Sequence, residues 1–205
     1  MKYLYLDTST SYLYAGVVSD DKLIFEIKDK LENNLSTFSL ALIEKKFKEY
    51  SIDIKEINKI IVVNGPGSFT GVRIGVTIAK TWAWAMKIDI TEISSLLAMA
   101  ISCNKDCYKI PIIDARRDCY YAGIYDPSNK IIMGDSYITK DDLMKKLKSL
   151  DSYVFVGKEG LEENIEEYDP DILKIVNFTK NFESINPHAV NPNYLKLTQA
   201  EENLK

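Results

Sequence analysis

The chain has 205 residues, of which 46% are hydrophobic and 27% charged, a composition ordinary for a soluble globular protein. Its formal net charge of −4 excludes a positive field over the whole surface that would attract nucleic acid. No apolar run approaches the roughly 18 residues of a membrane span, and the N-terminus lacks a signal-peptide core, so we expect a cytoplasmic protein without a membrane partner. Three cysteines without CxxC spacing and a single histidine, His188, predict neither a disulfide framework nor a metal site.

Strands and helices alternate along the first half of the chain. Short runs rich in Tyr, Leu, Ile and Val at 2–6, 12–18 and 22–27, separated by the polar turns DTSTS and SDD, predict an antiparallel meander. A helix is predicted at 35–50, a buried strand at 57–63 and a second helix at 70–86. A short strand at 88–90 and a helix at 94–103 follow.

The second half of the chain repeats the opening pattern. Aligning LYLDTSTSYLYAGVVSDD with PIIDARRDCYYAGIYDPS places Asp7 on Asp114 and the first Tyr-Ala-Gly on the second. Thr139 then opens a helix with Asp142 three positions later, as in a capping box. We therefore predict an α/β fold of two lobes, 1–103 and 104–205, each a mixed sheet with helices and joined without a flexible linker. The alternative is that two strand-turn-strand segments are similar by chance.

A glycine-containing loop, NGPGSFTG, precedes the helix at 70–86. Its glycines are spaced G-x-G-x-x-x-G, which differs from the dinucleotide fingerprint, and Val-Arg follows where a Walker loop needs a lysine and a hydroxyl. We interpret it as a strand-to-helix turn in which a serine or threonine caps the helix. The predicted loop and cap residues are Gly65, Pro66, Gly67, Ser68, Phe69, Thr70 and Arg73.

Both long helices have more apolar surface than one domain needs. In the helix at 70–86, small residues at intervals of four form a ridge beside larger apolar residues, and the apolar arc of roughly 200° is about twice that of a surface helix. Two interpretations fit: a helical protein–protein interface, or burial within one large domain. The residues that we assign to a partner interface are Leu35, Phe38, Leu42, Lys46, Gly71, Ile74, Gly75, Ile78, Ala79, Trp82 and Ala83.

The stretch GPGSFTGVRIGVTIAK, together with LDTST, ISSLLAMA, IDARRDCYYAGIY and NPNYLKL, resembles the bacterial TsaB (YeaZ) family over nearly the whole chain. The resemblance implies a duplicated actin-like, Hsp70-like (ASKHA) fold and a role in making threonylcarbamoyladenosine at position 37 of ANN-decoding tRNAs. It also implies a non-catalytic scaffold, homodimeric alone and heterodimeric with the catalytic paralogue TsaD. The contact would be a bundle of two helices from each subunit, here 35–50 and 70–86.

The resemblance extends to further partners and to cofactors. It implies that the ATPase TsaE joins the complex, that tRNA is bound through the complex rather than by this chain, and that ATP and a metal ion belong to the partner subunit. No cofactor is therefore expected in this chain. Two departures affect expected contacts: Asn33 and Asn34 stand where many members have a histidine, and Lys196 stands where the C-terminal motif ends in arginine.

The residues give little support to catalysis. The HxxxH metal pair of the paralogue needs two histidines, and kinases of this fold begin with an Asp-x-Gly phosphate turn, where this chain has Asp7-Thr8-Ser9. The alternative function is an ATP-dependent phosphotransferase in which Asp7 and Asp114 face each other across a cleft. The simpler interpretation is that each aspartate closes a strand turn with its own side chain. A peptidase would need a nucleophile–histidine couple, which no motif in the sequence indicates.

Overall fold

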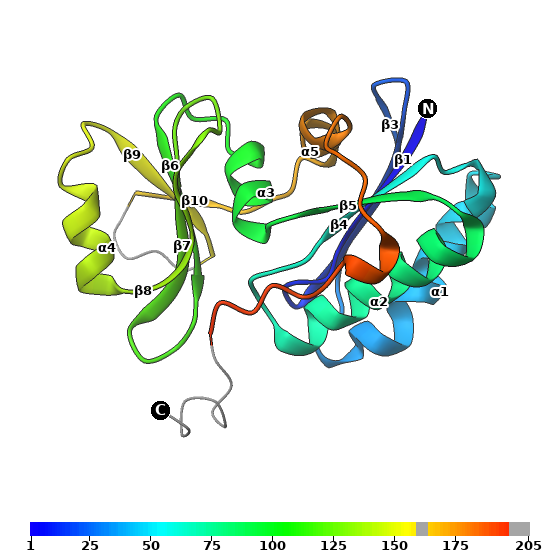
Figure 1. Ribbon diagram of the computed structural model, residues 1–205, viewed down its shortest axis with the longest axis horizontal. Coiled ribbons are helices and arrows are strands. Elements are labelled where there is room, and N and C mark those ends of the chain that lie inside the picture. The colour runs from blue at the N-terminus through cyan, green and yellow to red at the C-terminus, as the bar shows by residue number, and fades with distance from the viewer. Residues whose placement is uncertain (159–163, 197–205) are drawn as a thin grey trace.

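The computed structural model describes residues 1–158 and 164–196 and shows two lobes, each built on one sheet (Figure 1). The first sheet has five strands in the order β3-β2-β1-β4-β5. They are β1 (Lys2–Asp7), β2 (Tyr12–Ser19), β3 (Lys22–Lys30), β4 (Lys59–Val63) and β5 (Asp89–Ile93). Strand β1 pairs antiparallel with β2 and parallel with β4, so the predicted meander forms one half of a mixed sheet.

The second lobe repeats the topology of the first. Its five strands have the order β10-β9-β6-β7-β8, which is the first order read from the other end. They are β6 (Tyr108–Asp114), β7 (Cys119–Tyr125), β8 (Ile131–Thr139), β9 (Tyr153–Gly157) and β10 (Ile165–Glu167). Again the first strand pairs antiparallel with the second and parallel with the fourth. The predicted duplication and the actin-like fold class are thus confirmed.

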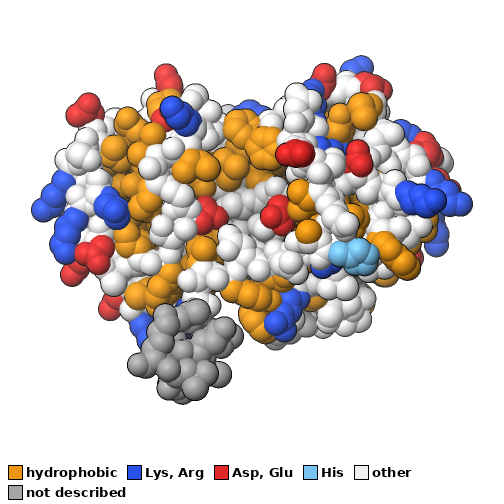
Figure 2. Space-filling model, viewed as in Figure 1, with side chains coloured by type: hydrophobic (Ala, Val, Ile, Leu, Met, Phe, Trp, Pro, Cys, Tyr) orange, Lys and Arg blue, Asp and Glu red, His pale blue; other side chains and the backbone are white. Residues whose placement is uncertain are grey.

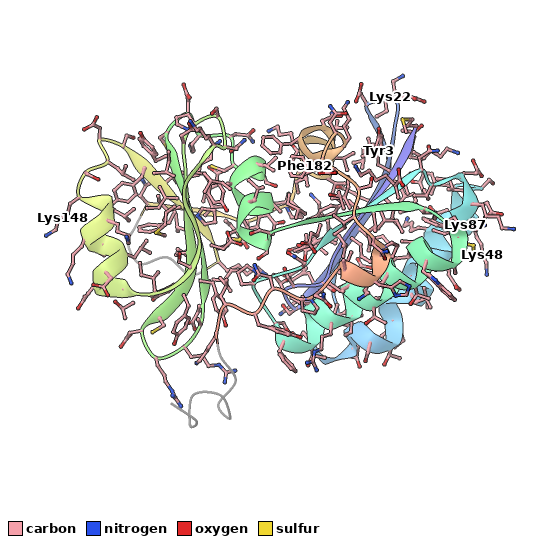
Figure 3. All side chains as sticks on the ribbon, viewed as in Figure 1. Tyr3, Lys22, Lys48, Lys87, Lys148 and Phe182 are labelled. Carbon is pink, nitrogen blue, oxygen red and sulfur yellow. The ribbon has the colours of Figure 1, made fainter. Side chains whose placement is uncertain are left out.

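Helices cover both sheets and fill the space between them. Helices α1 (Leu35–Glu49) and α2 (Phe69–Met86) lie on the outer face of the first sheet, and α4 (Lys140–Leu147) lies outside the second (Figure 1). Figure 3 shows Lys48 and Lys87, at the ends of α1 and α2, at the same outer edge, so the two helices run in the same direction. Between the lobes lie α3 (Ser95–Ser102) and α5 (Ile172–Thr179). None of the described helices is long and apolar enough to span a membrane.

The lobes share one hydrophobic cluster. It joins Ile61 of β4 with Tyr125 of β7 and Val154 of β9 through α3 and α5. After α5 the chain returns to the first lobe as a C-terminal strap, which we define as residues 183–196: Thr91 donates a side-chain hydrogen bond to the carbonyl oxygen of Glu183. The division at residues 103 and 104 stays a prediction about domains, and the strap shows that part of the second segment packs against the first lobe.

Candidate partner interface

Helix α1 is anchored by one buried stripe. Leu35, Ser39, Ile43 and Phe47, spaced four residues apart, are all buried, and the ring of Phe47 stacks on Trp82 of α2 at a centroid distance of 6.2 Å. This spacing places the four side chains on the face toward the sheet. Leu42 also packs against the core of the first lobe and Lys46 is half-buried, whereas Phe38 and Leu40 are exposed.

The small-residue ridge of α2 also faces inward, against its own chain. The Thr8 hydroxyl donates a 2.6 Å hydrogen bond to the carbonyl oxygen of Gly71, and a Cβ added at Gly75 would lie 2.5 Å from Thr8 Oγ1. Ala79 and Ala83 are 0% and 1% exposed. The burial of Gly71, Gly75, Ala79, Ala83 and Leu35 favours the alternative interpretation for these residues, burial within their own domain. The ridge does permit close backbone approach, but the backbone that approaches is the β1–β2 turn.

The remaining six assigned residues keep part of their surface accessible to solvent, although four of them, Leu42, Ile74, Ile78 and Trp82, also pack against the core of the first lobe. We call this set the helix-pair face: Phe38, Leu42 and Lys46 on α1, and Ile74, Ile78 and Trp82 on α2. Phe38 is 48% exposed, and Leu40 and Tyr50, which the sequence-based assignment missed, are 41% and 43% exposed. Large apolar side chains gathered on two neighbouring surface helices are typical of a protein–protein interface. The helix-pair face thus remains the predicted partner site.

The glycine loop is held by internal contacts. Ser68 Oγ accepts a 3.2 Å hydrogen bond from the Gly71 N–H. Of the two candidate caps, Ser68 therefore caps α2 and Thr70 does not. The Ser68 N–H donates a 2.7 Å hydrogen bond to the carbonyl oxygen of Ser9. The Ser95 N–H donates one of 2.9 Å to the carbonyl oxygen of Gly65. Gly65 has φ of +106°, in the region that favours glycine. The loop thus joins the β1–β2 turn to α3, which agrees with its interpretation as a strand-to-helix turn.

The two aspartates of the repeat each close their own turn. Asp7 Oδ1 accepts a 2.7 Å hydrogen bond from the Ser9 N–H, and Asp114 Oδ1 accepts one of 2.7 Å from the Arg116 N–H. Burial raises the pKa of Asp7 above its ordinary value, although hydrogen bonds from Ser9 and Tyr5 oppose the rise. Asp114 lines a cavity of about 260 Å³ between the lobes, whereas Asp7 is not in that lining. This arrangement favours the simpler interpretation of both residues.

The described part of the chain gives little support to a metal site or to catalysis by its histidine. No three His, Cys, Asp or Glu side chains among residues 1–158 and 164–196 come close enough to hold a metal ion. His188 lies on the strap with its ring 6.3 Å from that of Trp84. By its fold the molecule belongs to the class of two-lobed, actin-like proteins, and the helix-pair face is its predicted partner site.

Comparison with known proteins narrows this class. A family model described as TsaD, tRNA N6-adenosine threonylcarbamoyltransferase, matches residues 32–173. The chain is 30% identical to the tRNA threonylcarbamoyladenosine biosynthesis protein TsaB of Bacillus subtilis, over 98% of this chain and 96% of that protein. It has the fold of YeaZ from Pseudomonas aeruginosa, with a TM-score of 0.82, 18% identity and coverage of 95% of this chain and 99% of that one. The chain belongs to the TsaB (YeaZ) family.

Proposed function

We propose that this chain serves the synthesis of threonylcarbamoyladenosine in tRNA as a non-catalytic subunit that pairs with a TsaD-type transferase through the helix-pair face. The observation that carries the proposal is the outward apolar surface of α1 and α2, whose inner faces are already fully used by the fold. The name of the Bacillus subtilis relative supplies the pathway. The family model of the transferase, matching 32–173, supports a partner of the same fold as this chain.

The partner would supply the chemistry in this proposal. ATP and a metal ion would be held by the transferase, the ATPase TsaE would join the assembled pair, and the lone chain would form a homodimer through the same face. Within this chain, Asp7 and the Ser68 N–H are both occupied by turn contacts. A phosphate could not bind the Ser68 N–H without breaking its hydrogen bond to the Ser9 carbonyl oxygen, which joins the β1–β2 turn to the start of α2.

A charge placed in the helix-pair face tests the proposal. Phe38→Glu changes a side chain that is 48% exposed, so the fold should tolerate it. Because a central interface residue typically contributes about 2 kcal/mol or more, we expect pairing with the transferase to weaken at least roughly tenfold. Pairing is measured by sedimentation and copurification, and function by tRNA modification in the reconstituted system.

Ile132→Glu is the matched control. Ile132 is 53% exposed on β8 of the other lobe and carries the same change of charge. It should pair normally and support modification. A folded Phe38→Glu variant that pairs as tightly as Ile132→Glu would overturn the helix-pair assignment.

A further inference from the structure

Two of the three arginines of the chain lie around the start of α2, and the third, Arg117, follows one of them directly in the sequence. The chain has 26 Lys and Arg residues, and the arginines are Arg73, Arg116 and Arg117. Arg116 lines a cavity of about 430 Å³ together with Phe69, and the Arg73 guanidinium carbon lies 3.8 Å from the centre of the Phe69 ring. Arginine is the cation best suited to binding phosphate and to stacking on flat rings. The chain uses lysine for nearly all of its cations, so arginines gathered in one region indicate that they bind the same ligand.

These charges form no ion pair with a carboxylate in the described part of the chain. Throughout residues 1–158 and 164–196, neither the arginines nor Lys196 form an ion pair with a carboxylate. Lys196 lies on the strap, with Nζ 5.4 Å from the centre of the Tyr137 ring. In a chain of net charge −4, four cations at one end of the interlobe surface that form no ion pair among the described residues favour an anionic ligand.

The turn that carries two of the arginines has a costly backbone. Arg116, Arg117 and Asp118 have φ of 66°, 57° and 54°, a left-handed conformation in three successive non-glycine residues. The turn is fixed at both ends, because Asp114 Oδ1 accepts from the Arg116 N–H at 2.7 Å and the Lys140 N–H donates to the Asp118 carbonyl oxygen at 3.0 Å. The equivalent β1–β2 turn has no such residue. A strained turn that survives between two rigid strands is often retained for function.

Exposed aromatic rings lie beside the charges. Phe69 and Tyr194 are 50% and 45% exposed, and their rings stack at a centroid distance of 5.1 Å. Arg73 Nε donates a 2.6 Å hydrogen bond to the Tyr194 hydroxyl. Both rings border a pocket of about 180 Å³, which Lys196 also lines. Figure 2 shows a Lys or Arg side chain directly against hydrophobic ones at the lower middle of the molecule, where α2 begins.

We infer that this arginine patch binds an unpaired stretch of the tRNA when the subunit is part of the complex. The patch consists of Phe69, Arg73, Arg116, Arg117, Tyr194 and Lys196. Unpaired bases stack on aromatic rings and guanidinium planes while neighbouring cations neutralise the phosphates, and the patch offers both together. An acidic protein segment would use the cations but not the exposed ring faces. The inference rests on the proposed function, which supplies tRNA as the substrate, and gives this chain a direct part in holding it.

The effect should be visible only in the complex. Four cations against a net charge of −4 give the lone chain a weak hold on RNA, so the subunit alone should bind tRNA poorly and release it readily in salt. Joined to a transferase that already holds the tRNA, the same contacts add to existing ones. The measurement therefore uses the purified pair of this chain and the transferase.

The test compares two double variants in that pair. Arg116→Gln with Arg117→Gln removes the turn cations, and Lys145→Gln with Lys146→Gln removes two adjacent exposed cations from α4 as a matched control. With the arginines replaced, we expect the Kd for unmodified tRNA to rise roughly tenfold and the slope of log K against log salt to fall by about 1.4, since each single-strand phosphate contact contributes about 0.7. The control should stay within about twofold. Tyr194→Ala should raise the Kd about fivefold or more without changing the slope.

Each other result contradicts the inference. An unchanged Kd and salt slope in a pair that still assembles would overturn it and leave the proposed function intact. Failure of the arginine variant to assemble with the transferase would make the patch a protein contact. Competition by AMP at the concentration at which a single-stranded oligonucleotide competes would make it a site for free nucleotide. Failure of the unaltered chain to pair with the transferase would instead contradict the proposed function, and the inference with it.

Discussion

The Thr8 hydroxyl donates a 2.6 Å hydrogen bond to the carbonyl oxygen of Gly71, joining the turn after β1 to the first turn of α2. This contact is possible because the α2 residues that face the turn are glycines, which let backbone and hydroxyl come within hydrogen-bond distance. The ridge of small residues therefore serves the fold of this chain. It leaves the exposed surface of α2, which includes Trp84 and Met86, outside this contact.

Substitution of Gly75 should destabilise the fold. In Gly75→Ala the new Cβ would lie 2.5 Å from Thr8 Oγ1, closer than real Cβ contacts, so the turn or the helix must shift. Overpacking of this kind costs about 1–3 kcal/mol, measured as the free energy of unfolding in urea. Thr77→Ala, at an exposed position of the same helix, should change it by no more than about 0.5 kcal/mol. A Gly75→Ala protein of full stability that no longer pairs with the transferase would restore the ridge as an interface.

The pH dependence of stability should carry the signature of Asp7. Because burial raises its pKa in the folded chain, the folded state binds its proton more tightly than the unfolded state does. Stability contributed by this group is therefore greatest at low pH, and it is lost as the pH rises from the unfolded value of about 3.9 through the folded pKa. Asp7→Asn keeps an acceptor for the Ser9 N–H but cannot titrate. Urea unfolding between pH 4 and 8 should show wild-type stability falling relative to this variant as the pH rises.

Asp126→Asn provides a control in which the dependence of stability on pH should have the opposite sign. The pKa of Asp126 is lowered by hydrogen bonds, first from the Ser128 hydroxyl and then from the Lys130 N–H. Its contribution is present at neutral pH and is lost as the pH falls. Parallel curves for wild type and Asp7→Asn would show that Asp7 has an ordinary pKa and would contradict its burial.

Local sequence patterns predicted the elements from β1 to α4. The alternation of apolar and polar residues in strands and the spacing of apolar residues three or four positions apart in helices are both visible within short stretches of sequence. They did not predict β9, β10, α5 or the strap. The strap lacks periodicity and is held by isolated long-range bonds, such as that from the Asn193 N–H to the Asn64 carbonyl oxygen at 2.7 Å. The interface assignment included residues buried in this chain for a related reason. Periodicity showed that α2 has two apolar sides, but it cannot show which side the chain's own sheet will cover.

The isolated chain should show no ATPase, kinase or peptidase activity above background. Asp7 is 1% exposed and bonded to its own turn, and Asp114 lies in a cavity that Asp7 does not line. The two carboxylates therefore cannot act together on one substrate in this arrangement. Phosphate release from ATP is the direct measurement. Sustained turnover that Asp7→Ala abolishes and Asp126→Ala preserves would support the phosphotransferase alternative.

Release of the strap should follow from the loss of one lysine. Lys80 Nζ donates hydrogen bonds to the carbonyl oxygens of His188 at 3.2 Å and Val190 at 2.7 Å, and the Val190 side chain is fully buried in the first core. Lys80→Met keeps the aliphatic stem but removes the ammonium group and with it both hydrogen bonds, and a hydrogen bond from a charged group typically contributes about 1.5–3 kcal/mol. We expect faster amide exchange across the strap while the strands of the first sheet stay protected, because the strap lies outside the sheet. Lys48→Met, at an exposed position of α1, should leave exchange in the strap unchanged. Equal exchange in the two variants would show that Val190 and the Asn193 bond hold the strap without Lys80.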